Sequence, residues 1–197
     1  MKKLLRSFLL AAVVGGLTLI PATASASGEY VIDTDGAHAF VQFRINHLGF
    51  SWLYGRFNDF EGRFSYDAEN PENSDVELTI DVASIDSNHA ERDRHLRGDD
   101  FFHVRRFPTA TFVSTGFEDH GDGTATLTGD LTLKDVTREV TIDVEHIGHG
   151  EDPWGNYRRG FQGETAITLT DFNIDYELGP DAREAYLELA VEGIRQD

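Results

Sequence analysis

The sequence predicts an all-β fold, an antiparallel barrel of about eight strands with one short helix. Along about eight segments, apolar and polar residues alternate with a period of two, which is typical of strands with one buried face. Stretches rich in glycine, proline, asparagine and aspartate separate these segments, as in antiparallel hairpins. Closing such a sheet into a barrel buries every apolar face and leaves no strand edge unpaired.

The first element is a predicted leader over residues 1–26. Residues 1–7 carry three positive charges, residues 8–20 contain almost no polar group, and an Ala-Ser-Ala sequence suited to signal-peptidase cleavage ends at Ala26. The apolar run is too short for a membrane-spanning helix, which needs about 20 residues. We therefore expect a cleaved signal peptide, location in the periplasm, and a single barrel domain over residues 27–197.

Strands are expected throughout the domain. In the first of them, Val41, Phe43 and Ile45 alternate with Gln42 and Arg44, so one face of the strand is apolar. The same pattern recurs along the chain. The predicted strands cover residues 37–46, 60–67, 76–82, 109–115, 124–133, 139–145, 161–169 and 185–191.

One segment, residues 88–98, breaks the alternation and predicts a short helix. Asn88 and Glu91 have the spacing of an N-terminal capping box, and Asp93 and Arg97 have the spacing of a charged pair one turn apart. Nearly all of its side chains are polar. We therefore expect the helix to lie on the outside or over one end of the barrel, anchored by the two phenylalanines that follow it.

The composition excludes several classes of function. The chain has no cysteine, which excludes disulfides, zinc–thiolate sites and iron–sulfur clusters. Its net charge is −18, and the leader contains three cations but no acid, so the rest of the chain is more acidic still. Nucleic acid and anionic membrane surfaces are therefore not expected as partners, because both attract clustered cations. After the leader, Lys134 is the only lysine.

The inward-facing residues predict a cavity. Small residues recur on the apolar faces, namely Ala39, Gly62, Ala110, Ser114, Ala125, Gly129, Gly163 and Thr165. They would leave space for one small ligand, although facing Phe and Tyr rings could instead fill that space. As binding residues we predict large apolar side chains of the wall, aromatic side chains at the mouth and one inward glycine. The wall residues are Phe43, Phe60, Phe64, Leu78, Ile80, Phe112, Leu131, Ile142, Phe161, Ile167, Leu169, Leu187 and Leu189, the mouth residues are Trp52, Tyr54 and Phe101, and the glycine is Gly163.

Signatures of catalysis and metal binding are weak. The sequence has no Gly-x-Ser-x-Gly elbow, no His-Glu-x-x-His pair and no phosphate-binding loop. His146 and His149 are three residues apart on a predicted strand, where their side chains should face opposite ways, so we do not expect them to share a metal. His47, Asp99 and Asp100 are candidate acid or base groups near the mouth, but no orienting partner is identifiable. We predict no catalytic residue, no metal site and no cofactor.

Five segments together carry a resemblance to a known family. The chain resembles the YceI family of bacterial periplasmic proteins, which implies a lipocalin-like antiparallel barrel whose cavity holds a polyisoprenoid chain, such as a quinone tail or a related prenyl lipid. The family has no agreed enzymatic activity. This chain has Asp135 and Asn173 where many members have glycine. The resemblance lies in residues 38–55, 88–97, 129–133, 152–155 and 171–174.

Three hypotheses for the function follow. The first is an exported lipid-binding protein, not an enzyme, that holds a polyisoprenoid or quinone as carrier or reservoir, without stable membrane insertion. The second is a filled barrel with a stress or interaction role, whose acidic surface meets a cationic partner. The third is an envelope enzyme that acts on a lipid. Organic extraction separates the first from the second, and turnover of the extracted lipid would identify the third.

Overall fold

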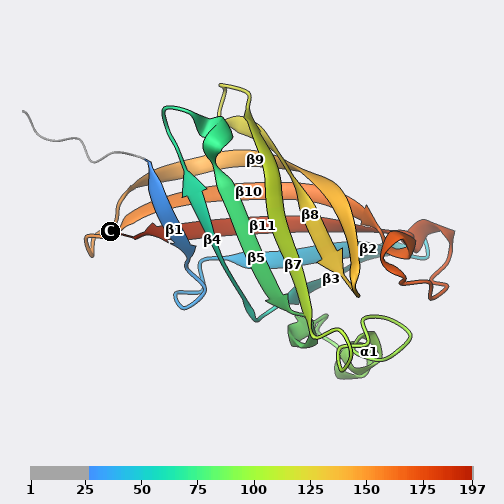
Figure 1. Ribbon diagram of the computed structural model, residues 1–197. Coiled ribbons are helices and arrows are strands. Elements are labelled where there is room, and N and C mark those ends of the chain that lie inside the picture. Colours follow the sequence, from blue (N-terminus) through green and yellow to red (C-terminus); the bar gives the residue numbers. More distant parts are fainter. Residues whose placement is uncertain (1–26, 197) are drawn as a thin grey trace, which may run out of the picture.

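The computed structural model of the chain describes residues 27–196 and shows a closed antiparallel β-barrel (Figure 1). Each strand of the ring pairs with the next, and the last strand pairs back with the first. This arrangement confirms the predicted eight-stranded antiparallel barrel with one helix. In order around the ring the strands are β1 (Gly28–Ile32), β4 (Phe60–Tyr66), β5 (Asp75–Asp81), β7 (Thr109–Asp119), β8 (Thr124–Leu133), β9 (Val136–Glu151), β10 (Tyr157–Thr168) and β11 (Glu184–Arg195).

A hairpin extends the wall of the barrel. Its strands are β2 (Phe40–His47) and β3 (Ser51–Phe57), and β2 pairs with the first half of β11 while β1 pairs with its end. The short β6 (Ile85–Asp86) pairs with β3. The predicted strands correspond to β2, β4, β5 and β7 to β11, whereas β1, β3 and β6 were not predicted. Alternation does not reveal β1, which has only five residues, or β3, which carries large apolar side chains on both faces.

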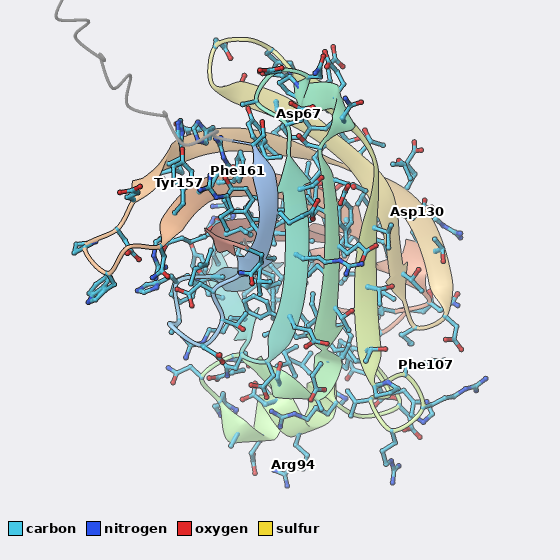
Figure 2. All side chains as sticks on the ribbon, turned by 60° about the vertical axis from the view of Figure 1, so that its left-hand side comes forward. Asp67, Arg94, Phe107, Asp130, Tyr157 and Phe161 are labelled. Atoms are coloured by element: carbon cyan, nitrogen blue, oxygen red, sulfur yellow. The ribbon has the colours of Figure 1, made fainter. Side chains whose placement is uncertain are left out.

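The helix α1 (Ala90–Leu96) lies at one end of the barrel (Figure 1), where Arg94 marks it in Figure 2. The predicted capping box is wrong. The N-cap residue is His89, whose side chain accepts a hydrogen bond from the Arg92 N–H at 3.2 Å. Asn88 lies one residue earlier, with a left-handed backbone at φ 61°, so it cannot take the cap position.

Hydrogen bonds fasten α1 to the segment before it. Asp93 is buried and accepts from the Ser87 N–H at 2.8 Å, while Arg97 donates to the carbonyl oxygens of Ala83 and Ile85 at 2.7 and 2.6 Å. The predicted pairing of Asp93 with Arg97 is therefore wrong, because tertiary partners take both side chains. These hydrogen bonds hold the helix at the end of the barrel.

Short 3-10 helices complete the fold, and the two within residues 169–182 lie beside the same end. Phe101 is 5% exposed and Phe102 packs against the adjoining core, so the expected anchoring is confirmed. Among the described residues, no helix combines the length and the apolar character that crossing a bilayer requires. The 3-10 helices are η1 (Pro71–Asn73), η2 (Val82–Ser84), η3 (Leu169–Phe172) and η4 (Pro180–Ala182).

Candidate functional site

Side chains fill most of the half of the barrel away from α1. Tyr30 stacks on Phe64 with ring centroids 4.8 Å apart, and Phe64 meets Phe161 edge-on at 5.6 Å. Figure 2 shows Phe161 toward the end opposite α1. A Cβ at Gly163 would lie 3.0 Å from Cγ2 of Ile142, so no gap exists beside this glycine. The expectation that small inward residues leave room for a ligand is therefore wrong at Gly163, because neighbouring side chains occupy the room, whereas Ala125 lines a smaller pocket of about 160 Å³ at this end.

The half of the barrel next to α1 is hollow. It contains a cavity of about 540 Å³ whose wall is almost entirely apolar. This volume falls within the range of about 300–1,000 Å³ that is usual for small-molecule pockets. Strands β2, β3, β8, β10 and β11 supply one part of the wall, and α1 with residues 169–182 supplies the rim.

Seven of the predicted binding residues line this cavity. Strand alternation turns those on the strands inward, as on β2, where Val41, Phe43 and Ile45 all reach the cavity, whereas Phe101 follows α1 and Leu169 begins η3. Ala110 and Ala185 also line it, so here small residues do leave space. The seven are Phe43, Ile80, Phe101, Leu131, Ile167, Leu169 and Leu187.

The other predicted binding residues lie elsewhere. Trp52 and Tyr54 lie on the outer face of β3, because the alternation turns Leu53 and Phe57 toward the cavity instead. A further group packs in the core beside the cavity or in the filled half. It consists of Phe60, Leu78 and Leu189, which pack against the cluster next to the cavity, and of Phe64, Phe112, Ile142, Phe161 and Gly163.

Residues 174–178 supply a part of the site that sequence reasoning missed. Ile174, Tyr176 and Leu178 line the cavity although their segment is irregular. Periodicity gives no signal in such a segment. The signal that could have located it is the family-like segment 171–174, which lies directly before these residues.

Two turns that shape the cavity end have left-handed backbones. Asn173 terminates η3 with φ 56°, and Asp135 follows β8 with φ 58°. These are the two positions where the resemblance to the family leads us to expect glycine. Asn and Asp are the non-glycine residues that adopt this conformation most readily, so the departures from the family pattern preserve the local backbone.

Polar groups gather at the rim of the apolar cavity. Arg92 and His47 reach it from α1 and β2, and Nε2 of His95 lies 3.0 Å from a carboxylate oxygen of Asp100. Nε of Arg92 donates to Oγ of Ser87 at 2.7 Å, which holds the guanidinium in place. Donors and acceptors at the mouth with an apolar wall behind them suit a ligand that has a polar head and an apolar tail.

The candidate acid and base groups near the mouth differ in whether they line the cavity. His47 lines the cavity, whereas Asp99 pairs with Nε2 of His103 at 3.2 Å. Asp100 contacts His95, whose ring lies edge-on to Phe101 at 4.9 Å between centroids. His95 thus belongs to the aromatic rim and also contacts a carboxylate, and its geometry suits holding a head group.

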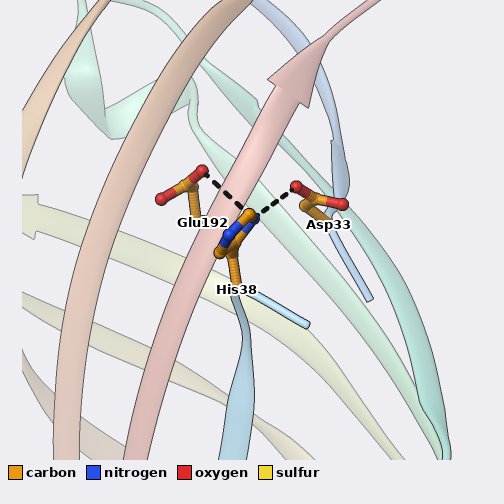
Figure 3. Close-up of side chains that lie close together, drawn as sticks. All are labelled: Asp33, His38 and Glu192. Carbon is orange, nitrogen blue, oxygen red and sulfur yellow. Dashed lines mark hydrogen bonds and ion pairs between the residues drawn. The ribbon is translucent and has the colours of Figure 1, made fainter. Parts of the chain in front are cut away.

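A cluster at the opposite end of the barrel has the composition of a metal site (Figure 3). Asp33, His38 and Glu192 place their potential ligand atoms within 4.8 Å of one another. However, Nη1 of Arg158 lies 2.6 Å from Oδ2 of Asp33 and 2.5 Å from Oε1 of Glu192, and its Nε contacts Asp152. Because a guanidinium already uses these oxygens and would repel a second cation, we interpret the cluster as an ion-pair network that ties β10 and β11 to the turn after β1.

The network controls the protonation of its members. The hydrogen bonds from His38 and Arg158 lower the pKa of Asp33 from 3.8 to about 2. The hydrogen bonds that Arg158 makes, first to Asp152 and then to Asp33, raise the pKa of Arg158 above its ordinary value. The carboxylate and the guanidinium are therefore charged over the whole ordinary pH range.

His146 and His149 lie together, contrary to the prediction that they face opposite ways. Their ring centroids are 5.1 Å apart because β9 bulges at Ile147, where the register with β10 slips by one residue. Nε2 of His146 accepts a hydrogen bond from Nη1 of Arg159 at 3.1 Å. Burial first, and then Arg159 and His149, lower the pKa of His146. The pair is thus neutral at neutral pH, and its inward nitrogen is occupied by Arg159.

The fold and the cavity define a class of protein. Eight-stranded antiparallel barrels of this kind, when not filled by their own side chains, hold one small ligand. The family model described as a YceI-like domain matches residues 30–192, and the chain belongs to the YceI family. A UPF0312 protein of Ectopseudomonas mendocina is 54% identical over 187 residues, which are 95% of this chain and 97% of the relative. A UPF0312 protein of Shewanella denitrificans is 50% identical over 98% of this chain and 100% of the relative.

Solved structures share the architecture. BcnA of Burkholderia cenocepacia superposes with a TM-score of 0.73 at 24% identity, covering 82% of this chain and 98% of that protein. The YceI protein of Campylobacter jejuni gives 0.67 at 27% identity over 78% and 91% of the two chains. A polyisoprenoid binding domain from Saccharophagus degradans gives 0.62 at 15% identity over 85% and 98%. These likenesses support the lipocalin-like barrel.

Proposed function

We propose that the protein binds a polyisoprenoid lipid in the cavity and acts as an exported carrier or reservoir in the periplasm, with no catalytic step. The observation that carries the proposal is the apolar cavity of about 540 Å³ beside α1, which opens at a polar rim. A prenyl quinone or a related prenyl lipid combines the two properties that this site matches. Its tail is apolar along its length, and its head has hydrogen-bonding oxygens.

Apolar burial supplies the binding energy in this proposal. Each buried methylene contributes about 0.8 kcal/mol, so a few prenyl units outweigh the cost of association without further hydrogen bonds. The apolar wall of the cavity, which includes Phe43 and Leu187, supplies that burial. Arg92 or His47 contacts the head group at the rim. A tail longer than the cavity would extend through the mouth.

Two further observations support the proposal. The domain from Saccharophagus degradans is described as polyisoprenoid binding, and its barrel resembles this one. The predicted leader, residues 1–26, has the pattern of a signal peptide, although it lies outside the described residues. An intact mass that begins at Ser27 in protein from the envelope fraction is expected, and a retained leader would contradict export.

Extraction of the purified protein tests the lipid directly. We expect mass spectrometry of an organic extract to find a polyprenyl lipid, and delipidated protein to take up an added polyprenyl quinone. Ala110→Leu fills the cavity and should reduce uptake at least tenfold, because Ala110 is a buried cavity residue. Ala166→Leu is the matched control, since Ala166 is exposed on β10.

The outcomes separate the three hypotheses. Wild-type protein that carries no lipid and takes up no added polyprenyl quinone would contradict the carrier and leave the filled barrel. Conversion of the quinone or of the extracted lipid into a new product would identify an enzyme. Equal loss of uptake in Ala110→Leu and Ala166→Leu would show that the cavity is not the binding site.

A further inference from the structure

The turn between β2 and β3 lies at the cavity end of the barrel (Figure 1, right), and it carries exposed apolar side chains. Phe50 is 85% exposed and Leu48 is 53% exposed. Trp52, two residues further on, is 42% exposed on the outer face of β3. Large apolar groups that gather on one exposed feature usually mark an interaction site.

The backbone of this turn is unusual for the residue it holds. Leu48 and Gly49 have φ values of 56° and 77°, and the Phe50 N–H donates to the His47 carbonyl oxygen at 2.9 Å. This hydrogen bond closes a β-turn over residues 47–50, and β-turns with positive φ at both central positions are dominated by Gly, Asn and Asp there. A branched apolar residue in this conformation is strained, and such strain tends to persist at functional positions. The chain thus keeps an apolar side chain at the tip where a polar one would fit more easily.

The tip is continuous with the mouth of the cavity. Leu48 itself lines the cavity, and its Cδ2 would lie 3.4 Å from a Cβ at Gly179 on the opposite rim. Behind the tip, the Arg44 guanidinium lies 4.9 Å from the centre of the Trp52 ring and 5.5 Å from that of Tyr186. Leucine and phenylalanine at the turn, followed by a layer of Trp, Tyr and Arg, is the order of side chains found where proteins enter a membrane interface.

We propose that Leu48, Phe50 and Trp52, which we call the hairpin tip, dock into the interfacial region of a zwitterionic bilayer and place the cavity mouth against the membrane surface. A prenyl chain could then pass between bilayer and barrel without crossing water. This inference rests on the proposed function. The tip dips into the interface reversibly and does not span the bilayer.

A bilayer suits the hairpin tip better than a protein partner does. Two side chains on a narrow turn and one at the start of β3 form a wedge, whereas specific protein interfaces bury about 1,200–2,000 Å² in total. Wedges of Leu, Phe and Trp bind at the boundary between head groups and acyl chains. The net charge of −18 opposes anionic surfaces, so docking should weaken as anionic lipid is added.

The two tryptophans of the chain allow a sharp test. Trp52 is at the tip, whereas Trp154 is 79% exposed in the β9–β10 turn, at the other end of β10 from residues 169–182. Delipidated Trp154→Phe protein, mixed with phosphatidylcholine vesicles, should show a blue-shifted emission that brominated lipid quenches. Delipidated Trp52→Phe protein should show neither effect.

Substitutions at the tip supply the second measurement. Leu48→Asn combined with Phe50→Ser should lower vesicle partitioning at least tenfold in co-flotation. Leu48→Asn alone should keep or raise the melting temperature, which rules out unfolding as the cause. Ile147→Ser is the matched control, because Ile147 is 62% exposed at the bulge of β9, away from the turn between β2 and β3, and its loss should leave partitioning unchanged.

The fluorescence and partitioning measurements do not depend on a bound prenyl lipid, since delipidated protein is used. If the protein carries prenyl lipid but does not bind vesicles, the docking proposal is overturned and the proposed function stays intact. Partitioning by the tip in protein that never binds prenyl lipid would support the docking surface and contradict the lipid cargo. Quenching of Trp154, equal losses in Ile147→Ser, or a dimer that the tip variants dissociate without any vesicle binding would overturn the proposal.

Discussion

The ring of Phe112 on β7 lies over Gly129 on the neighbouring strand β8, in the space that a side chain would otherwise occupy. This contact belongs to the filled half of the barrel, where small residues and rings complement one another. In the other half, Ala110 and Ala185 face an open cavity. One barrel thus combines a packed half that stabilises the fold with a hollow half that can hold a ligand.

The first prediction concerns this packed half. Gly129→Ala should destabilise the protein by about 1–3 kcal/mol, because the added methyl group collides with the Phe112 ring and the Val113 carbonyl oxygen. Urea unfolding measures the change. Gly116→Ala on β7 is the control, since a Cβ there meets nothing within 4 Å, and it should be neutral or slightly stabilising. Equal costs at both positions would contradict the packing argument.

The second prediction concerns Gly163, which the sequence presents as a gap for the ligand. Since a Cβ there would already lie 3.0 Å from Cγ2 of Ile142, Gly163→Leu should overpack the core and cost about 1–3 kcal/mol or more. The lipid bound per folded molecule should stay unchanged. Lipid loss without loss of stability would show instead that the cavity extends into this half.

The sequence predicts most of the strands for a definite physical reason. One buried face imposes alternation on a strand, and Val41, Phe43 and Ile45 on β2 record it directly. The same rule located six of the seven predicted residues that line the cavity, and the seventh, Phe101, follows α1. Alternation failed as a guide where the backbone departs from the two-residue period of a strand, as at the bulge beside His146 and in the irregular segment that brings Tyr176 to the rim.

Sequence reasoning also could not divide the barrel into its two halves. Whether an inward glycine leaves space depends on which ring lies opposite, and that depends on pairing between strands. Gly129 and Ala110 look alike as small inward residues, yet one lies under Phe112 and the other faces the cavity.

The third prediction concerns the ion-pair network at the far end. The pKa of Asp33 is about 2 in the folded protein against 3.8 ordinarily, so its ionised form stabilises the fold above pH 3.8. That contribution is lost as the pH falls from 3.8 through 2. Asp33→Asn should therefore lower the melting temperature at pH 7 and flatten its fall between pH 4 and pH 2. An unchanged acid slope would contradict the role of the network.

The fourth prediction concerns His146, whose pKa is lowered by burial and by Arg159. Below the ordinary value of 6.5 the unfolded chain binds a proton that the folded protein resists, so stability falls as the pH drops through this range. His146→Gln should reduce this fall, measured by urea unfolding between pH 7.5 and pH 5. His120→Gln, at an exposed position in the β7–β8 turn, is the comparison, and an equal effect there would exclude a specific role for His146.

The last prediction concerns the left-handed turn that ends η3 and leads into the rim. Asn173 has φ 56°, and its carbonyl oxygen accepts a hydrogen bond from Nζ of Lys134 at 2.5 Å, which ties the rim to the end of β8. Asn173→Gly should be neutral or stabilising, whereas Asn173→Val should cost about 1–2 kcal/mol, because a β-branched residue resists this conformation. Ile174 and Tyr176 follow directly, so the valine variant should also bind polyprenyl quinone more weakly, as measured by fluorescence titration of delipidated protein. Equal stability and equal quinone binding of the valine and glycine variants would contradict the inference that the left-handed backbone of Asn173 shapes the rim.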